Sequence, residues 1–258
     1  MPSPSSALRL HLKDDPASAG RAAAAEAAQT LRQALAERGS ARVVFAAAPS
    51  QQHLLAALAA EPDIDWSQVT AFHMDEYIGL PGDAPQRFGS WLNTAFFRLL
   101  PLQAVHLIDP GPDPADSADR YRRLLAERPI DLVCLGIGVN GHLAFNDPPV
   151  ADLSDPLDVK VVRLDEICRR QQVDEGCFAE LDDVPREAVT LTVPRLLDAR
   201  RLVAVVSGLH KSDAVHRALV DPVSAACPAT ALRTHHDASL YLDADAASLL
   251  PPEVRRAG

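Results

Sequence analysis

One stretch of the sequence, LGIGVNGHLAFNDPP at residues 135–149, places a histidine between an amide and a carboxylate. His142 has Asn140 two residues before it and Asp147 five residues after it. A histidine beside a carboxylate can shuttle a proton near neutral pH, because imidazole titrates in that range. A tight turn with an incidental histidine would contain the same residue types. The stretch therefore predicts either a proton shuttle formed by His142, Asp147 and Asn140, or a turn without chemistry.

A second polar segment, FHMDEYIGLP at residues 72–81, carries two consecutive carboxylates at the end of an apolar run. A carboxylate that is partly buried in a cleft has a raised pKa, and it can move protons on and off carbon. Asp75 is therefore a candidate general base; a polar turn in which the aspartate caps a helix is the alternative. A metal site that joins Asp75 and Glu76 to His73 and His142 would lack a recognised ligand spacing such as HExxH. We therefore predict no metal.

Ser50 and Gln51 lie where a predicted strand gives way to a helix, in the segment AAAPSQQH at residues 46–53. The first N–H groups of a helix attract anions, and the Ser50 hydroxyl would add a further donor. The segment predicts a phosphate site, with a simple helix N-cap as the alternative. Lys211 lies at a similar junction, where a cation is unfavourable unless an anion binds beside it. Arg170 is a further candidate for the anion, with a solvent-facing position as its alternative.

Gly136, Gly138 and Gly141 have the spacing G-x-G-x-x-G. Glycine lets the backbone approach a ligand closely or adopt a positive φ, so Gly138 and Gly141 are candidate binding residues. The same spacing occurs in dinucleotide sites, where a long helix follows and receives the pyrophosphate. Here two prolines at residues 148–149 end the segment, so we predict no nucleotide cofactor.

The 258-residue chain has a formal net charge of −10 and only 5% aromatic residues, which argues against a nucleic-acid partner. The first 20 residues lack the apolar core of a signal peptide. No run of residues reaches the roughly 18 apolar residues that a membrane span needs. The four cysteines form no CxxC pair, which favours reduced thiols. We therefore predict a cytoplasmic protein that contacts neither nucleic acid nor membrane.

Hydrophobic periodicity predicts strands that alternate with helices. The predicted strands span residues 8–12, 41–48, 68–72, 105–107, 130–135, 159–164, 188–193, 202–207 and 239–242. The predicted helices span residues 16–38, 51–60, 87–100, 115–127, 165–173 and 210–220. The alternation favours one domain over residues 1–258, with a mainly parallel sheet covered on both faces and a disordered tail at residues 1–7. Ligands of such sheets bind beyond the carboxyl ends of the strands, where both polar stretches fall.

Four segments together resemble the glucosamine-6-phosphate deaminases of the glucosamine/galactosamine-6-phosphate isomerase superfamily. They are FHMDEYIGLP, GIGVNGHLAFNDP, AVTLTVPRLLDARRLVAVVSGLHKSDAV and CPATALRTH, and the similarity extends loosely from residue 20 to residue 245. The related 6-phosphogluconolactonases usually carry DER-type and GHTASLFP-type motifs, which this sequence does not contain. The resemblance implies an α/β fold, a modified Rossmann-like three-layer sandwich with a mainly parallel central sheet and no nucleotide.

The family converts glucosamine 6-phosphate to fructose 6-phosphate and ammonia without a metal or cofactor, so the resemblance implies a small sugar phosphate as substrate. By position, Asp75 resembles the general base that takes the C2 proton and returns it to C1. His142 resembles the acid/base that opens the sugar ring at O5, with Asp147 as its supporting carboxylate. Lys211 and Ser50 match phosphate-binding positions. A homo-oligomer is compatible with the resemblance.

Four positions depart from the family pattern. Asn140 and Asp147 replace an aspartate and a glutamate, Ala-Pro-Ser-Gln replaces a glycine-rich phosphate loop, and Gln172 falls where an arginine is usual. An amide orients imidazole but cannot stabilise imidazolium as a carboxylate does, which leaves Asp147 as the charge partner. We predict a glucosamine-6-phosphate deaminase. The alternatives are an isomerase or lactonase for another sugar phosphate, or a non-catalytic sugar-phosphate sensor.

Overall fold

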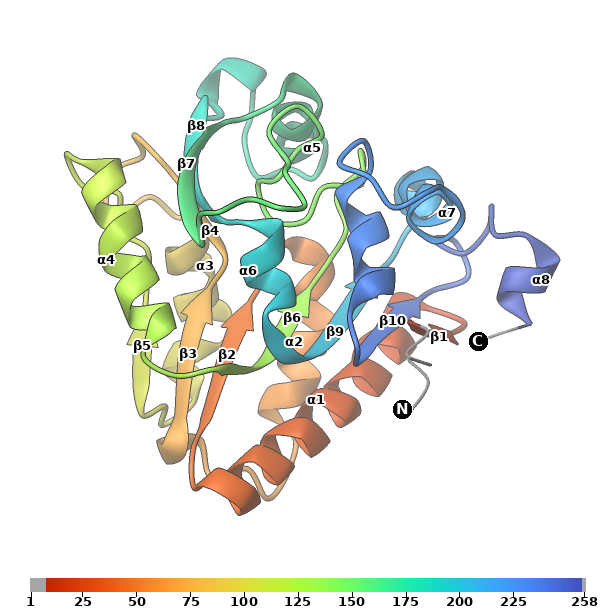
Figure 1. The fold of residues 1–258 in the computed structure, drawn as a ribbon, viewed down its shortest axis with the longest axis horizontal. Coiled ribbons are helices and arrows are strands. Elements are labelled where there is room, and N and C mark those ends of the chain that lie inside the picture. Colours follow the sequence, from red (N-terminus) through yellow and green to blue (C-terminus); the bar gives the residue numbers. More distant parts are fainter. Residues whose placement is uncertain (1–7, 257–258) are drawn as a thin grey trace.

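A parallel sheet forms the centre of the computed structural model, which describes residues 8–256 (Figure 1). Its seven strands follow the order β1-β10-β9-β6-β2-β3-β5, and each neighbouring pair is parallel. The strands are β1 (Arg9–Leu12), β2 (Ala41–Phe45), β3 (Val69–His73), β5 (Ala104–His106), β6 (Ile130–Leu135), β9 (Ala199–Val206) and β10 (Ala238–Leu242). The prediction of a mainly parallel central sheet is confirmed; the tail predicted at residues 1–7 lies outside the described residues.

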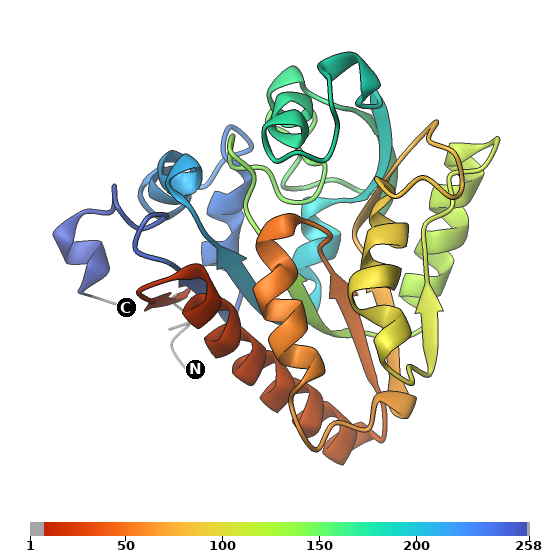
Figure 2. The same ribbon diagram turned by 180° about the vertical axis from the view of Figure 1, so that it is seen from behind.

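Helices cover both faces of this sheet. One face carries α1 (Pro16–Arg38), α2 (Gln52–Ala59) and α3 (Phe88–Ala95), which lie toward the viewer in Figure 2. The other face carries α4 (Pro114–Ala126), α6 (Val193–Leu197) and α7 (Ser212–Val220). The short helix α8 (Pro252–Arg255) follows near the C-terminus. The helix–sheet–helix order confirms the three-layer α/β sandwich.

The central strands are apolar along their whole length because both of their faces are buried. Successive strand residues point to opposite faces of a sheet. Val43 and Phe45 of β2 accordingly pack in the core beneath α1 and α2, while Val44 packs in the core beneath α4. Every residue of β2 and β6 is buried. This explains the continuous apolar runs from which the sequence predicts these strands.

Local signals set the ends of α1. The Asp15 side chain accepts a hydrogen bond from the Ser18 N–H at 2.8 Å, and Pro16 occupies the first turn. Gly39 ends the helix with a φ of 69°, a left-handed conformation that favours glycine. Gly20 faces α2, and a Cβ built there would lie 2.5 Å from the Cβ of His53. The close approach of α1 holds α2 against the sheet next to β2.

A second, antiparallel sheet lies above the carboxyl ends of the parallel strands in Figure 1. Its three strands follow the order β4 (Asp75–Tyr77), β8 (Glu187–Leu191) and β7 (Val159–Arg163). Two expectations are wrong here. Residues 75–77, between the strand predicted at 68–72 and the helix predicted at 87–100, form a strand, and the strands predicted at 159–164 and 188–193 do not join the parallel sheet. Asp75 pairs with Thr190, far along the chain, and local periodicity carries no sign of such a partner.

Helix α5 (Glu166–Asp174) lies beside the second sheet, and the two together stand over the carboxyl ends of the parallel strands (Figure 1). Helix α6 begins where a strand was expected to end. Thr192 caps it by accepting a hydrogen bond from the Arg195 N–H at 3.3 Å, and Pro194 lies in its first turn. Within residues 8–256 there is no helix with the length and apolar character that crossing a bilayer requires.

Candidate active site

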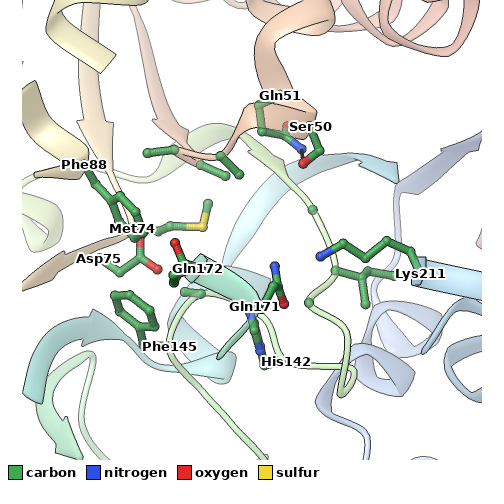
Figure 3. Close-up of a pocket in the computed structure, with 17 residues that line it drawn as sticks. Ser50, Gln51, Met74, Asp75, Phe88, His142, Phe145, Gln171, Gln172 and Lys211 are labelled. Carbon is green, nitrogen blue, oxygen red and sulfur yellow. Dashed lines mark hydrogen bonds between the residues drawn. The ribbon is translucent and has the colours of Figure 1, made fainter. Parts of the chain in front are cut away.

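A pocket lies between the carboxyl ends of the parallel strands and the second sheet (Figure 3). Its walls come from segments that are far apart in sequence: the turn η1 (Pro49–Gln51), strand β4, the loop after β6, helix α5 and the turn η5 (Leu209–Lys211). The lining includes Ser50, Gln51, Met74, Asp75, Phe88, Gly138, His142, Phe145, Gln171, Gln172 and Lys211. The fold therefore brings both polar stretches of the sequence into one site.

Two side chains behind the pocket hold His142. Its Nδ1 atom lies 2.8 Å from Asn140 Oδ1 and 3.0 Å from Asp147 Oδ1. The Asn140 amide also donates to Asp147 Oδ1 at 2.9 Å, so it bridges the other two side chains. Because Nδ1 faces two oxygens, the neutral ring carries its proton there. Nε2 has no hydrogen-bond partner in residues 8–256, which leaves it available to a ligand in the pocket.

Asp147 is fully buried, with 0% of the residue exposed. Burial by itself raises the pKa of a carboxyl, but the hydrogen bond and charge of His142, together with Asn140, hold the pKa of Asp147 below its ordinary value. The Asp165 N–H lies 3.3 Å from Oδ2 and acts in the same direction. Asp147 is therefore an anion next to the imidazole, placed to stabilise an imidazolium.

Gly138 allows the imidazole to lie against the backbone. A Cβ built on Gly138 would lie 2.1 Å from both Cε1 and Nε2 of His142, which no real structure tolerates. The Gly138 N–H also donates to the His142 carbonyl at 3.0 Å. Gly138 lines the pocket as predicted, and its missing side chain has the additional effect of seating the histidine ring.

Asp75 lies across the pocket from Lys211 (Figure 3). It is 6% exposed, and its carboxylate has no hydrogen-bond or ion-pair partner among the described residues. Burial raises the pKa of Asp75 well above its ordinary value, and the negative charge of Glu76 raises it further. A carboxylate with a raised pKa is a stronger base, so this side chain is suited to taking a proton from carbon.

The neighbouring Glu76 points to the opposite side of β4 and stabilises the start of α3. Its Oε1 accepts from the Phe88 N–H at 3.0 Å, and its Oε2 accepts from the Gly89 N–H at 3.0 Å. Arg87 Nε lies 3.5 Å from the same Oε2. Strand alternation thus separates two consecutive carboxylates, one facing the pocket and one at a helix N-terminus. The contact also fixes Phe88 in the pocket wall.

Lys211 supplies a positive charge on the other side of the pocket. The residue is 3% exposed, and its Nζ points toward the pocket (Figure 3). Burial lowers the pKa of Lys211, and the carboxylate of Glu175 opposes that shift. Glu175 Oε1 lies 3.2 Å from Nζ. A buried ammonium group in this place can bind an anionic group of a ligand.

Ser50 and Gln51 belong to the turn η1, and α2 begins after them. The Ser50 hydroxyl caps neither the turn η1 nor helix α2, so the N-cap alternative for Ser50 is wrong. Gln51 Nε2 donates to the Val205 carbonyl at 3.2 Å, while its Oε1 has no partner in the described part of the chain. Both residues line the pocket, as the phosphate-site prediction requires.

Arg170 lies outside the pocket, contrary to its predicted binding role. Its Nη2 pairs with Glu166 Oε1 at 2.9 Å, one turn earlier on the exposed side of α5. The next two residues, Gln171 and Gln172, line the pocket instead. Successive helix residues point in directions about 100° apart. With α5 docked through its glutamine face, Arg170 must face solvent.

Gly141 forms a turn and does not line the pocket. Its φ is 87°, and a Cβ built on it would lie 2.5 Å from the Sγ of Cys227. Its N–H donates to the Gly138 carbonyl at 2.9 Å, and its carbonyl accepts from the Ala229 N–H at 2.8 Å. The predicted ligand contact at Gly141 is therefore replaced by a packing contact that shapes the histidine loop.

The contacts of His73, and those within the group His142, Asp147 and Cys168, disfavour a metal ion at either place. His73 Nε2 accepts from the Ile108 N–H at 2.7 Å, and burial, with a smaller effect of Arg87, lowers the pKa of His73 to about 3. His142, Asp147 and Cys168 do have potential ligand atoms within 4.8 Å of one another. Nδ1 of the histidine already contacts the aspartate, however. Burial also raises the pKa of the Cys168 thiol well above its ordinary value, which disfavours the thiolate.

Sequence reasoning misses the aromatic wall of the pocket. Phe88 and Phe145 stack with ring centroids 5.4 Å apart and an interplanar angle of 17°. Both residues line the pocket, although an isolated phenylalanine in the sequence indicates a core position. The available signal was the position of Phe145 inside the AFN segment of the histidine loop.

One pocket brings together a buried carboxylate, a carboxylate-supported histidine and a buried lysine. In an α/β protein this arrangement is suited to acid–base chemistry on a small anion. The sequence comparison is more specific. Residues 14–163 and 165–241 match the family described as glucosamine-6-phosphate isomerases/6-phosphogluconolactonase. The chain belongs to this family.

Curated relatives from two bacteria cover most of the chain. The glucosamine-6-phosphate deaminase of Exiguobacterium sibiricum is 35% identical over 198 residues, which are 76% of this chain and 76% of the relative. The glucosamine-6-phosphate deaminase of Streptococcus pneumoniae serotype 4 is 34% identical over 193 residues, 74% of this chain and 80% of the relative.

Solved structures share the fold. A monomeric glucosamine-6-phosphate deaminase superposes with a TM-score of 0.85 at 26% identity, covering 94% of this chain and 100% of that chain. A 6-phosphogluconolactonase from Shewanella baltica superposes with a TM-score of 0.74 at 20% identity, covering 92% and 97% of the two chains. At 20% identity the lactonase supports the fold alone.

Proposed function

We propose that this protein is a glucosamine-6-phosphate deaminase, which converts glucosamine 6-phosphate and water to fructose 6-phosphate and ammonia. The observation that carries the proposal is one pocket containing a buried, unpartnered carboxylate, Asp75, and a histidine backed by a carboxylate, His142 with Asp147. The first can move a proton on carbon and the second can move a proton on oxygen. Membership of the family and the two curated deaminases support the same reaction.

In the proposed mechanism, His142 catalyses the opening of the sugar ring. Its Nε2 accepts the proton of the sugar O1 hydroxyl and delivers a proton to O5, so that the C1–O5 bond breaks and an aldehyde forms at C1. The imidazolium that exists between these two transfers is stabilised by Asp147 at 3.0 Å. Asn140 orients the ring by accepting from Nδ1.

Asp75 then acts as the base for isomerisation, which leads to deamination. Its carboxylate takes the proton from C2, the substrate's C2 ammonium passes a proton to the carbonyl oxygen O1, and an enolamine forms with a double bond between C1 and C2. The same group returns the proton to C1, which leaves an iminium at C2. Water then adds to C2, and the C2–N bond breaks with ammonia as the leaving group. The raised pKa of Asp75 suits both the removal and the return of the proton.

In this proposal the sugar phosphate lies with its phosphate toward Lys211, Ser50 and Gln51. Gly138 also lines the pocket, and its missing side chain lets the backbone approach the ligand closely. Gln172 stands where the family usually has an arginine, so the pocket wall offers an amide in place of a second cation. Lys211 would then supply most of the electrostatic attraction for the phosphate.

The experiment is a substrate panel. Purified protein is incubated, with EDTA present, with glucosamine 6-phosphate, its galacto epimer and 6-phosphogluconolactone, and ammonia, ketose phosphate and lactone hydrolysis are measured. We expect ammonia and a ketose phosphate in equal amounts from an amino sugar phosphate, without need for a metal. Lactone hydrolysis without ammonia would instead support the lactonase alternative. Binding without any turnover would support a sugar-phosphate sensor.

The proposal concerns a single chain acting in the cytoplasm on a small molecule, with no nucleic-acid or membrane partner. One of the solved structures with this fold is a glucosamine-6-phosphate deaminase that is monomeric. Activity is therefore expected from the monomer of 27.7 kDa as well as from a homo-oligomer. Light scattering of the active fraction measures which form carries the ammonia-releasing activity.

A further inference from the structure

Glu175 contacts the hydrogen-bond donors at the end of the pocket where the substrate's phosphate is proposed to bind. Its Oε1 atom lies 3.2 Å from Lys211 Nζ and accepts a hydrogen bond from Gln171 Nε2 at 2.7 Å. Ammonium and amide N–H groups are the donors that a phosphate oxygen would use. A carboxylate oxygen of the protein therefore stands where the donors for a ligand anion converge.

We propose that Glu175 is an internal counter-ion that the substrate's phosphate has to displace, so that this residue sets the affinity of the pocket for sugar phosphates. The inference rests on the proposed function, because it takes Lys211 as the phosphate-binding cation. Lys211 is 3% exposed and needs an anion beside it when the pocket is empty. Glu175 meets that need, and it competes with the ligand for the same donors.

The surroundings of Glu175 allow its side chain to rotate away from Lys211. It is the residue directly after α5, and its side chain is 16% exposed. Gly176 follows with a φ of 75°, and nothing lies within 4 Å of a Cβ built on it. A second cavity, lined by Trp91, Gln172 and Glu175 itself, adjoins the catalytic pocket. A rotated Glu175 carboxylate can therefore turn toward this cavity and solvent.

The Gln171 side chain keeps its position when the Glu175 carboxylate rotates away from Lys211. Its Oε1 accepts a hydrogen bond from the Val139 N–H at 2.9 Å, which anchors the side chain independently of Glu175. Its Nε2 is then free to donate to the phosphate, next to Lys211 Nζ. When the substrate's phosphate displaces the Glu175 carboxylate, one anion therefore replaces another while the donors on Lys211 and Gln171 keep their positions.

The expected consequence is a change in binding without a change in chemistry. An ionised carboxylate close to a bound phosphate repels it, while a neutral amide in the same place does not. Glu175 is not among the residues lining the catalytic pocket that contains Asp75 and His142. Removing its charge should therefore strengthen phosphate binding and lower KM, with little effect on kcat.

The test compares wild type, Glu175→Gln and Asp174→Asn by calorimetric titration with inorganic phosphate. The glutamine keeps the shape and the acceptor oxygen, and Asp174 is an exposed carboxylate next to it that controls for net charge. We expect the Kd of Glu175→Gln to fall at least about tenfold, equivalent to about 1.4 kcal/mol, and that of Asp174→Asn to change less than threefold. A change below threefold in Glu175→Gln, or an equal change in both variants, overturns the inference.

Thermal unfolding gives a second readout that does not depend on turnover. Glu175→Gln leaves Lys211 without a counter-ion, so added phosphate should raise the Tm of this variant more than that of wild type. An equal rise overturns the inference. Kinetics separate it from the proposed function: a wild type that releases no ammonia contradicts the deaminase proposal, while the phosphate titration still decides the role of Glu175.

Discussion

Replacing Asp75 with asparagine should remove most of the turnover and at the same time make the protein more stable. The carboxylate is buried without a partner in residues 8–256, and burial and Glu76 raise the pKa of Asp75 well above its ordinary value. The folded chain therefore holds this proton at pH values where the unfolded chain has lost it. Stability falls as pH rises from the ordinary pKa to the folded one, and asparagine removes that dependence.

The size of the gain follows from the cost of an uncompensated buried polar group, about 1–3 kcal/mol. For a chain of this length about 1 kcal/mol corresponds to roughly 2–4 °C in Tm, so the variant should melt about 2–12 °C higher near pH 8. Near pH 3.8, the ordinary pKa of the carboxyl, the wild-type side chain is neutral in the folded state and the difference should largely vanish. Turnover should fall by about 10²–10⁴, the range for a general acid–base group.

The assay combines thermal unfolding at both pH values with ammonia release by wild type and Asp75→Asn. Asp174→Asn is the matched control, because it makes the same chemical change at an exposed position. A variant that is less stable than wild type near pH 8 would show that the Asp75 carboxylate has a stabilising partner. A variant with activity within threefold of wild type would remove Asp75 from the role of base.

Four further substitutions test the rest of the site by their steady-state kinetics. Asp147→Asn should lower kcat/KM by about 10²–10⁴, because His142 loses its charge partner, and Asn140→Asp should keep or raise it. Values within threefold of wild type for Asp147→Asn would make that carboxylate structural. Gly138→Ala should lower kcat/KM by about 10² or more, because the new Cβ would lie 2.1 Å from the ring of His142. A fully active Gly138→Ala enzyme would show that ring position is unimportant. Lys211→Met should raise KM for the sugar phosphate at least about tenfold with a smaller effect on kcat, and an unchanged KM would place the phosphate elsewhere.

The parallel sheet and most of its helices are predictable because their signals are local. Asp15 and Gly39 mark the ends of α1, and the apolar runs of β2 and β6 reflect burial on both faces. Strand β4 is not predictable in this way, since Asp75 is defined as a strand residue only by pairing with Thr190. A short strand whose partner is distant in sequence carries no periodicity of its own.

The residues of the site likewise divide into those that local sequence predicts and those that only tertiary packing brings together. The loop from Asn140 to Asp147 is short enough that its residue types alone predict their contact with His142. The orientation of α5 is set by tertiary packing, so sequence reasoning chose Arg170, whereas Gln171 and Gln172 reach the pocket. Glu175 was missed for a related reason, because its contact with Lys211 joins two elements that only the fold brings together.

The most direct test of the proposed reaction uses glucosamine 6-phosphate that carries deuterium at C2. Products are followed by NMR and by an ammonia assay, with EDTA present. Proton transfer by Asp75 predicts that ammonia and fructose 6-phosphate form in equal amounts, with the deuterium found at C1 or in the solvent. Ammonia release with the deuterium still on C2 would contradict the account, because it would require direct displacement of the amine without an enolamine.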